Sequence, residues 1–362
     1  SNMEFMLKQA STARADIPRA VDQQLRLYDM KARWRTNAVE WEANVLDSLN
    51  HLQYYKDTEW KNCTPATASD FSAIAYYFGK MLRDSLNVPV GLICNAVGGS
   101  PTEAWVDRAS LEYQFPAILK DWTKNDFIQE WVRGRAALNI KKSANSQQRH
   151  PYEPCYLYES GIRPLEQYPI RGVIWYQGES NISNYQFYAP MMTAMVQLWR
   201  NVWEAPDMPF YYVQIAPHKY KDSRDTGAAL LREAQMEALK TIPNSGMVPT
   251  TDIGDEFCIH PPQKDVVGLR LATLALTKTY GIRRLPSNGP TMTKVDYADK
   301  KAIVTFDNAP AGLFPTFSEL EGFEIAGADK KFYPAKARIA GRTRNVEVWS
   351  DQVAQPVAVR SA

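Results

Sequence analysis

The residues with the clearest chemical potential follow a short apolar run in the middle of the chain. Residues 173–176 read Val-Ile-Trp-Tyr, and five residues with polar or absent side chains come next: Gln177, Gly178, Glu179, Ser180 and Asn181. An unbroken apolar run of this length is typical of a buried parallel strand. Ligands of open α/β sheets bind outside the carboxyl ends of the strands, so the polar cluster predicts a site. An ordinary strand-to-helix connection is the alternative for this stretch alone.

A second candidate is His260, which follows several acidic residues and directly precedes two prolines. Pro261 or Pro262 is a favoured first-turn residue and predicts that a helix begins there. A histidine at a helix N-terminus feels a positive dipole worth about 0.3–1 kcal/mol, which favours the neutral ring that a general base requires. A histidine that merely caps the helix is the alternative.

Paired glycines, Gly98 and Gly99, follow another apolar run at residues 88–94. Their backbone N–H groups could point at a developing oxyanion, and the Gln177 amide could add a further donor. One donor of this kind is typically worth about 10²–10³ in rate. A plain tight turn is the alternative for the two glycines.

The nucleophile is harder to choose. Three serines lie near predicted strand ends or at the chain start: Ser1, Ser100 and Ser180. The spacing indicates only that a hydroxyl, an imidazole and an oxyanion hole could assemble without a metal. The four histidines form no i, i+4 pair, which argues against a zinc-dependent deacetylase.

Alternating strands and helices must position these residues. Apolar runs predict strands at residues 25–30, 88–94, 171–176, 210–215 and 247–253. Helical periodicity predicts helices at residues 71–86, 116–142, 188–203, 224–240 and 261–280, with Asp70 as a cap of the first and Gly281 as the C-cap of the last. Residues 31–67 look like loops with short pieces of structure. This alternation is typical of an α/β fold with a parallel sheet and helices on both faces.

The chain changes character after a Pro-Ser-Asn-Gly-Pro segment at residues 286–290. Short alternating strands with Gly and Pro turns follow, without a good helix. We therefore predict a first domain at residues 1–285 and a C-terminal β-rich domain at residues 286–362. The second is short for a sandwich, so we expect that it packs on the first domain or lacks strands from outside this chain.

Composition excludes several classes of protein. The 362 residues are 45% hydrophobic and 23% charged with a net charge of +2, too mild for a nucleic-acid partner, and no apolar run approaches the roughly 20 residues of a membrane span. The four cysteines are scattered and give no disulfide framework. No signal peptide is visible; because the chain starts without Met and inside a motif, we expect the natural protein to extend further upstream.

Four motifs, in order, resemble those of the sialate O-acetylesterase family, a carbohydrate-esterase branch of the SGNH hydrolases. Ser-Asn-Met-Glu-Phe at residues 1–5 resembles the tail of the family's Gly-Gln-Ser-Asn-Met-Glu motif. The other three are the Gly-Gly-Ser-Pro-Thr-Glu-Ala-Trp block within residues 91–105, the 173–181 stretch, and Ile-His-Pro-Pro-Gln-Lys at 259–264 with residues 267–272. The resemblance covers residues 1 to about 285 and continues through residues 320–329 and 356–360.

The resemblance implies a three-layer, flavodoxin-like SGNH hydrolase domain that needs no metal or cofactor. Carried over residue by residue, it makes Ser1 the nucleophile and His260 the general base. The Ser1 N–H, the Gly98-Gly99 backbone and the Gln177 side chain would surround the oxyanion. Glu179 and Asn181 would hold the loop around them.

Two departures from the family pattern matter. Many SGNH hydrolases carry an Asp three residues before the histidine, where this chain has Phe257. The partner of His260 could be Asp252, Asp255, a backbone carbonyl or none, and we favour Asp255. Family members also carry a long β-rich segment upstream of the serine motif and more residues after the last strand, both absent here.

The implied activity is removal of O-acetyl groups from sugars, with 9-O-acetyl sialic acid as the preferred substrate. An esterase for acetyl xylan or another plant polysaccharide is the nearest alternative, because the motifs describe acyl transfer and not the sugar. A sugar-binding protein without catalysis is the alternative of another class. The family further implies a periplasmic or extracellular location, and the oligomeric state stays open.

Overall fold

The structure is a computed structural model that describes residues 2–220, 226–283, 285, 287, 289–315 and 318–361. It separates into two compact units, Ser1–Arg283 and Arg284–Ala362. Each unit is described by itself below.

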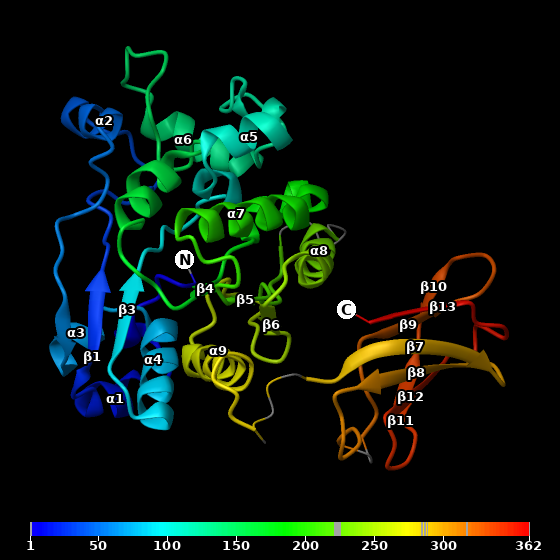
Figure 1. Cartoon of the computed structure of the whole chain (residues 1–362). Coiled ribbons are helices and arrows are strands. Elements are labelled where there is room, and N and C mark those ends of the chain that lie inside the picture. Colours follow the sequence, from blue (N-terminus) through cyan, green and yellow to red (C-terminus); the bar gives the residue numbers. More distant parts are fainter. Residues whose placement is uncertain are drawn as a thin grey trace. The chain divides into compact units, whose positions relative to one another are not determined.

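Two three-stranded sheets form the centre of the first unit (Figure 1). In one, β1 (Asp22–Asp29) pairs in parallel with β3 (Val90–Cys94) and antiparallel with β2 (Lys61–Cys63). The other has the order β4-β5-β6 and is entirely parallel, with bounds Val173–Trp175, Phe210–Val213 and Ser245–Val248. The predicted α/β class with parallel strands is confirmed.

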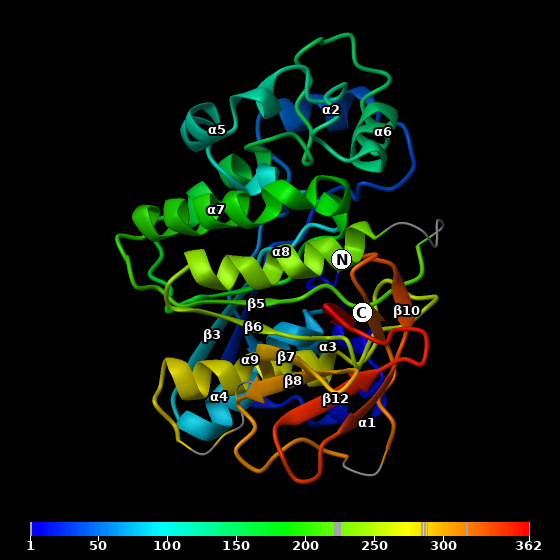
Figure 2. The same cartoon turned by 90° about the vertical axis from the view of Figure 1, so that its right-hand side faces the viewer.

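Helices cover both faces of these sheets. Figure 2 shows α7 and α8 on one side of β5 and β6, with α4 and α9 on the other. Their bounds are Ala73–Leu86 for α4, Tyr188–Val202 for α7, Gly227–Thr241 for α8 and Lys264–Lys278 for α9. Within each pair the helices contact each other, α4 against α9 and α7 against α8. The arrangement is therefore the expected three layers.

Helix α4 shows how local sequence sets these elements. The Ser72 hydroxyl accepts a hydrogen bond from the Ala75 N–H and begins the helix, and Asn87 ends it in the left-handed conformation. Asp70, predicted as the cap, instead ends the preceding short helix α3 (Pro65–Ser69). The predicted helix over residues 71–86 is thus confirmed, but its cap was placed two residues too early.

Several other boundaries differ from the sequence-based expectation. The predicted helix at 116–142 is a 3-10 turn at Pro116–Leu119 and, after a loop, α6 at Glu130–Asn139, because the intervening residues are largely polar and Asp121 has a positive φ of 45°. Helix α2 (Ala43–Asn50) lies where loops were expected. Strand β6 ends before Pro249, which cannot donate to a ladder. Helix α9 begins at Lys264, after both prolines.

The remaining elements of the first unit are short. They are α1 (Ala13–Asp16), α5 (Arg108–Gln114), a π-helical turn at Tyr158–Ile162, and 3-10 turns at Leu7–Gln9, Ile17–Arg19, Thr102–Trp105, Arg163–Leu165 and Glu179–Phe187.

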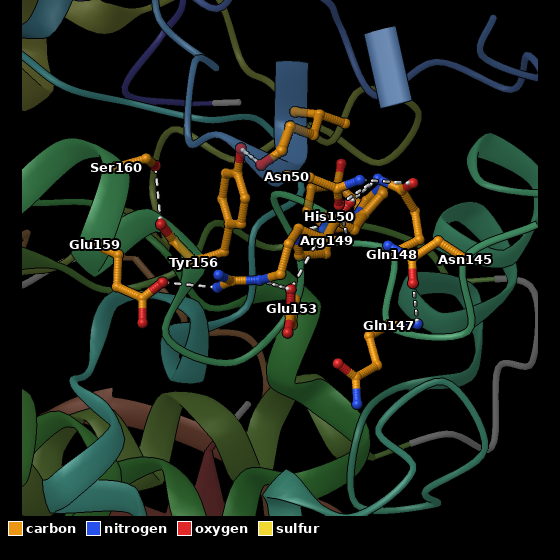
Figure 3. A network of polar contacts seen from close by, with 12 residues as sticks. Asn50, Asn145, Gln147, Gln148, Arg149, His150, Glu153, Tyr156, Glu159 and Ser160 are labelled. Atoms are coloured by element: carbon orange, nitrogen blue, oxygen red, sulfur yellow. Dashed lines mark hydrogen bonds and ion pairs between the residues drawn. The ribbon is translucent and has the colours of Figure 1, made fainter. Parts of the chain in front are cut away.

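A polar network fixes the connection that follows α6 (Figure 3). Arg149 pairs with Glu153 and Glu159, each at 2.7 Å, and its guanidinium lies 5.2 Å from the Tyr156 ring centre. The fully buried His150 ring accepts a hydrogen bond from the Tyr152 N–H at 2.9 Å. Burial lowers the pKa of His150 to about 3, so the ring is neutral. The network therefore holds Tyr152 in a fixed place, which matters for the site below.

The second unit consists of two antiparallel sheets. Their orders are β11-β12-β8-β7 and β10-β9-β13. The strands are β7 (Thr291–Ala298), β8 (Lys301–Asp307), β9 (Phe323–Ala326), β10 (Phe332–Pro334), β11 (Lys336–Ile339), β12 (Asn345–Trp349) and β13 (Ala358–Ser361). Val304, Ile325 and Val348 are nearly or fully buried in a core cluster of this unit. It is β-rich throughout its described part, as the sequence predicts.

We expect Gly268→Ala to lower the free energy of unfolding by about 1–3 kcal/mol, because helices α4 and α9 approach closely at this glycine. A Cβ at residue 268 would lie 2.6 Å from the Tyr77 Cβ and 2.8 Å from the Ile74 carbonyl oxygen. Urea unfolding measures the change. Gly134→Ala is the matched control: it lies inside α6, a Cβ there meets nothing within 4 Å, and it should stabilise by up to about 1 kcal/mol. Equal effects of both substitutions would contradict the close approach.

Candidate active site

A cleft of about 560 Å³ lies at the carboxyl ends of β3 and β4. Its walls come from segments far apart in the sequence: residues 2–6, 35–37, 95–100, 174–180 and 259–260, with Trp131, Arg135 and Tyr152. A sheet-end cleft is where α/β folds bind ligands. Of the residues predicted for the site, Gly98, Gly99, Gln177, Glu179 and His260 line this cleft, whereas Asp255 and Asn181 do not.

The predicted nucleophile, Ser1, lies outside the described residues. Its neighbour Asn2 is described and is buried. The Asn2 amide nitrogen donates to Glu179 Oε1 at 2.9 Å and to the Ile259 carbonyl oxygen at 3.2 Å, while its Oδ1 accepts from Lys264 Nζ at 2.6 Å. One side chain therefore ties the start of the chain to the loop after β4 and to the segment around His260.

The Asn2 amide bridges two buried charges of opposite sign. Lys264 is 1% exposed, and its ammonium lies 4.9 Å from the Phe5 ring centre and 5.7 Å from that of Tyr176. Burial lowers the pKa of Lys264 to about 8, an effect that the Glu179 carboxylate opposes. Burial likewise raises the pKa of Glu179, and Lys264 opposes that shift. Each of the two charges therefore offsets part of the effect of burial on the other.

His260 lines the cleft with a half-buried ring. Burial lowers the pKa of this ring to about 4, with Lys264 and His218 acting in the same direction. The neutral ring predicted from the sequence is therefore present at pH 7, but burial is the first cause. Helix α9 begins four residues later, at Lys264, so the helix dipole is not directly at the ring.

The acidic residues before His260 make contacts other than with its ring. Asp252 forms a two-point ion pair with Arg270, at 2.8 and 2.5 Å. Asp255 Oδ1 accepts the N–H groups of Phe257 and Cys258, at 2.8 and 2.9 Å, and so fixes the turn that leads to His260. Among the described residues no side chain hydrogen-bonds to the His260 ring. The role of Asp255 as its acid partner stays a prediction.

The Gly98-Gly99 loop is held by contacts on every side. The Gly98 N–H donates to Glu4 Oε2 at 3.1 Å, and the Gly98 carbonyl accepts from the Tyr152 hydroxyl at 2.7 Å. The Gly99 carbonyl accepts from the Ser180 hydroxyl at 2.9 Å. Gly99 has a positive φ of 77°, and a Cβ there would collide with Tyr152, so glycine is required. The Gly98 N–H is engaged, whereas the Gly99 N–H has no hydrogen bond to another described residue.

Gln177 belongs to a network that connects β4 to the loop after β3. Its amide nitrogen donates to the Ser100 carbonyl at 3.1 Å and to Asn181 Oδ1 at 2.7 Å, and its Oε1 accepts from the Thr102 hydroxyl at 2.7 Å. The Asn181 amide in turn donates to Glu103 Oε2 at 2.9 Å. Both Gln177 N–H donors are therefore occupied in this state, and an oxyanion could gain one only in exchange for the longer bond to Ser100.

Sequence reasoning assigned no role to several residues that shape the cleft. Lys264 and Glu103 lie within motifs already noted. Their burial could not be predicted, because charged residues are usually exposed. Arg35, Arg135 and Trp131 line the other part of the cleft, and Trp131 is 40% exposed. The Arg135 guanidinium donates to the Thr36 carbonyl at 2.6 Å, and neither arginine pairs with a carboxylate in the described part of the chain. Two cations and an exposed indole there suit an anionic, ring-shaped ligand.

Two further properties were searched over the described residues. No helix among them is both long and apolar enough to cross a membrane. No group of three or more His, Cys, Asp or Glu residues within that part of the chain is arranged to hold a metal ion.

The comparisons with known proteins agree with this geometry. The family described as carbohydrate esterase, sialic acid-specific acetylesterase, matches residues 128–277. The sialate O-acetylesterase of Rattus norvegicus is 27% identical over 338 residues, covering 85% of this chain and 60% of the rat protein. The Homo sapiens protein of the same name is 28% identical over 273 residues, covering 70% of this chain and 47% of its own length. This chain thus spans less than two thirds of either relative.

A solved structure extends the likeness over the whole chain. The crystal structure of a carbohydrate acetylesterase from Xanthomonas citri superposes with a TM-score of 0.78 at 34% sequence identity, covering 100% of this chain and 73% of that one. The cleft at the strand ends, the four motifs and this whole-chain match agree: the chain belongs to the carbohydrate esterase family of sialic acid-specific acetylesterases.

Proposed function

We propose that this protein removes O-acetyl groups from sugars with Ser1 as nucleophile and His260 as general base. The observation that carries the proposal is the clamp on Asn2, which fixes the residue next to Ser1 to Glu179, to Ile259 and to Lys264. Asn2, the residue after Ser1, and His260 line the same cleft. The family membership supports the same reaction.

The reaction proceeds in two balanced steps. The Ser1 oxygen attacks the acetyl carbonyl carbon while the His260 ring accepts the hydroxyl proton. The C–O bond to the sugar then breaks, and the ring returns the proton to the leaving sugar oxygen. In the second step a water attacks the acetyl-serine, its proton passes through His260 to the serine oxygen, and acetate leaves.

The developing oxyanion needs donors at the cleft floor. Of the two glycine N–H groups, that of Gly99 is the one free to supply a donor within the described residues, because the Gly98 N–H is held by Glu4. Gln177 can supply a side-chain donor by exchanging its bond to the Ser100 carbonyl for one to the oxyanion. Since that exchange gains a charge-assisted bond in the transition state alone, it contributes to rate rather than to substrate binding.

Lys264 has a second role in this mechanism. Its buried ammonium disfavours a second positive charge on the nearby His260 ring and so helps to keep the base unprotonated. A pKa of about 4 leaves the ring ready to accept a proton throughout the neutral range. Lys264 also donates a hydrogen bond to Asn2. The same residue therefore positions the neighbour of the nucleophile and lowers the pKa of the general base.

The proposed substrate is 9-O-acetyl sialic acid. A sialic acid carries a carboxylate, and the cleft offers Arg35 and Arg135 without a carboxylate partner in the described residues. Arginine binds carboxylates through two parallel hydrogen bonds, which are stronger than neutral ones. Trp131 beside them provides an exposed ring against which a sugar can pack. An acetylated xylan has an uncharged backbone and would leave both cations unused.

We expect Ser1→Ala and His260→Ala each to lower kcat for p-nitrophenyl acetate by at least about 10³-fold, because each removes a reacting group. Release of p-nitrophenol measures the rate. His51→Ala is the matched control, since His51 lies exposed at the end of α2, and it should leave the rate unchanged. Near wild-type rates in both site variants would exclude this mechanism.

Lys264→Met should raise the pKa of His260 above its value of about 4, because the variant removes a neighbouring positive charge. NMR titration of the ring measures the pKa directly. A base is inactive once protonated, so kcat/KM falls by about tenfold per pH unit below that pKa, and the acid limb should move to higher pH. Lys278→Met, at the other end of α9, is the control and should leave both values in place. An unmoved His260 pKa in Lys264→Met would refute the electrostatic role.

Arg35→Met and Arg135→Met should each raise KM for 9-O-acetyl sialic acid by about tenfold or more, because each removes a charge-assisted contact worth roughly 1.5–3 kcal/mol. KM for an acetylated xylose should change far less, since that sugar has no carboxylate. Arg133→Met is the matched control: Arg133 lies on the same helix as Arg135 but pairs with Asp126. An equal rise for both substrates would argue against carboxylate recognition.

A further inference from the structure

The peptide unit between Gly98 and Gly99 carries both the carbonyl that Tyr152 holds and the N–H group assigned above to the oxyanion. A peptide bond is planar and trans, so the Gly98 C=O and the Gly99 N–H lie in one plane and point in opposite directions. The Gly98 carbonyl oxygen accepts from the Tyr152 hydroxyl at 2.7 Å and lies 3.4 Å from the Thr36 hydroxyl oxygen. Whatever fixes this carbonyl therefore also fixes the direction of the Gly99 N–H.

The protons of the two hydroxyl groups can be placed from the number of donors. The Tyr152 and Thr36 hydroxyl oxygens lie 2.5 Å apart, and each hydroxyl has one proton to donate. Since Tyr152 donates to the Gly98 carbonyl, Thr36 donates to the Tyr152 oxygen. Burial raises the pKa of Tyr152 to about 12, so its hydroxyl keeps the proton at neutral pH. Two hydroxyls in series polarise each other and the carbonyl they reach, which makes the N–H of the same peptide unit a stronger donor.

A buried pair of side chains, Asn139 and His150, fixes both hydroxyls in place. The His150 ring accepts the Tyr152 N–H at 2.9 Å, and its other nitrogen lies 3.2 Å from Asn139 Oδ1. The Asn139 amide nitrogen donates to the carbonyls of residues 37 and 39, at 2.8 and 2.6 Å, and so holds the segment that carries Thr36. Both side chains are fully buried, and His150 belongs to the polar network of Figure 3. The fold therefore sets the place of both hydroxyls before a substrate binds.

The neighbouring polar groups of the glycine loop are held as well. Glu4 Oε2 accepts the Gly98 N–H at 3.1 Å, and the Ser180 hydroxyl donates to the Gly99 carbonyl at 2.9 Å. The Gly99 N–H is the fourth polar group of these two glycines and has no hydrogen bond to another residue that the structure describes. The peptide unit is thus held on both sides, and rotating it would break the bond to Tyr152.

We propose that Tyr152, with Thr36 behind it, is a positioning residue that orients and strengthens the Gly99 N–H as an oxyanion donor. The inference rests on the proposed esterase reaction and deepens it. Tyr152 acts through the peptide unit and not by contact with the reacting atoms. A donor that is oriented in advance needs no reorganisation when the negative charge develops, so the hydroxyl contributes to kcat and not to KM.

Tyr152→Phe removes the hydroxyl and keeps the ring. It should lower kcat for p-nitrophenyl acetate by at least about tenfold, part of the roughly 10²–10³-fold that a lost donor costs, with KM within about twofold. Tyr156→Phe is the matched control, because this ring is also buried and its hydroxyl donates to another backbone carbonyl, that of Leu49, at 3.0 Å. The control should keep the wild-type kcat. Equal kcat in the two variants, or a loss that appears mainly in KM, would overturn the proposal.

The role of Thr36 is tested by combining variants. Thr36→Val leaves the Tyr152 bond in place and should lower kcat only slightly. The double variant Thr36→Val/Tyr152→Phe removes both hydroxyls near the Gly98 carbonyl, so its kcat should approach the full loss of about 10²–10³-fold. A double variant as active as the wild type would contradict the proposal.

NMR separates this inference from the esterase mechanism. The amide nitrogen resonance of Gly99 reports the hydrogen bond at the Gly98 carbonyl, because both groups belong to one peptide unit. It should move in Tyr152→Phe but not in Tyr156→Phe, and the same movement should occur when Ser1→Ala is also present, since the bond does not depend on turnover. A lowered kcat with an unmoved resonance, or a moved resonance with wild-type kcat, would each refute the positioning role.

The resonance also decides the matter should Tyr152→Phe fail to fold. Thr36→Val keeps the ring and the Tyr152 bond but removes the hydroxyl that polarises it. The Gly99 resonance should then move in Thr36→Val, while that of Gly246, in the distant strand β6, stays in place. An unmoved Gly99 resonance would contradict the series of hydroxyls.

Discussion

The first unit depends on a buried amide held between two buried charges. The Asn2 amide oxygen accepts a hydrogen bond from the Lys264 ammonium, and the Asn2 amide nitrogen donates one to the Glu179 carboxylate. Removing any one of the three leaves a charge or a strong polar group unmatched in the protein interior, which typically costs about 3–5 kcal/mol when a buried pair is broken. These contacts hold together three segments that are distant in the sequence: the start of the chain, the loop after β4 and the start of α9. Residues 2–6, 174–180 and 259–260 of this joined region line the cleft.

The same arrangement explains how a neutral histidine and a protonated lysine can lie close together in one site. A general base must be neutral and a clamp must be charged. His260 loses its proton readily because it is half-buried and near a cation, whereas Lys264 keeps its own through Glu179. A neutral hydrogen-bond donor in place of Lys264 could also hold the Asn2 oxygen, but it would not lower the pKa of the histidine.

The sequence predicts most of the elements and the position of the cleft, but not the contacts that join its walls. Helix α4 follows from apolar spacing alone, and the cleft follows from the rule about strand ends. Helix α2 was missed although Val45, Leu46 and Leu49 are buried on one face of it, because a helix of only eight residues repeats the apolar spacing too few times. Helix α6 lies within the helix predicted at residues 116–142, which was placed too long. The contact of Lys264 with Asn2 spans 262 positions, and no local pattern reports a partner so far away.

The order of the strands is a second feature of the fold that the sequence does not predict. Strand-forming runs can be recognised one by one, but their order depends on which edges meet in space. Five apolar runs predict one parallel sheet, whereas the described part of the first unit has two three-stranded sheets with a groove between them. The groove lies between β3 and β4, the two strands whose following loops build the cleft.

Glu103 lies outside the cleft, but it affects the orientation of a polar side chain inside it. The carboxyl group is fully buried, its Oε1 has no hydrogen-bond partner among the described residues, and burial raises its pKa to about 7. Its Oε2 accepts from the Asn181 amide in either protonation state, which turns the Asn181 oxygen toward Gln177 and Thr102. Because that oxygen can only accept, the Gln177 nitrogen must face it. The orientation of the predicted oxyanion donor is therefore fixed two side chains away, by a group that does not line the cleft.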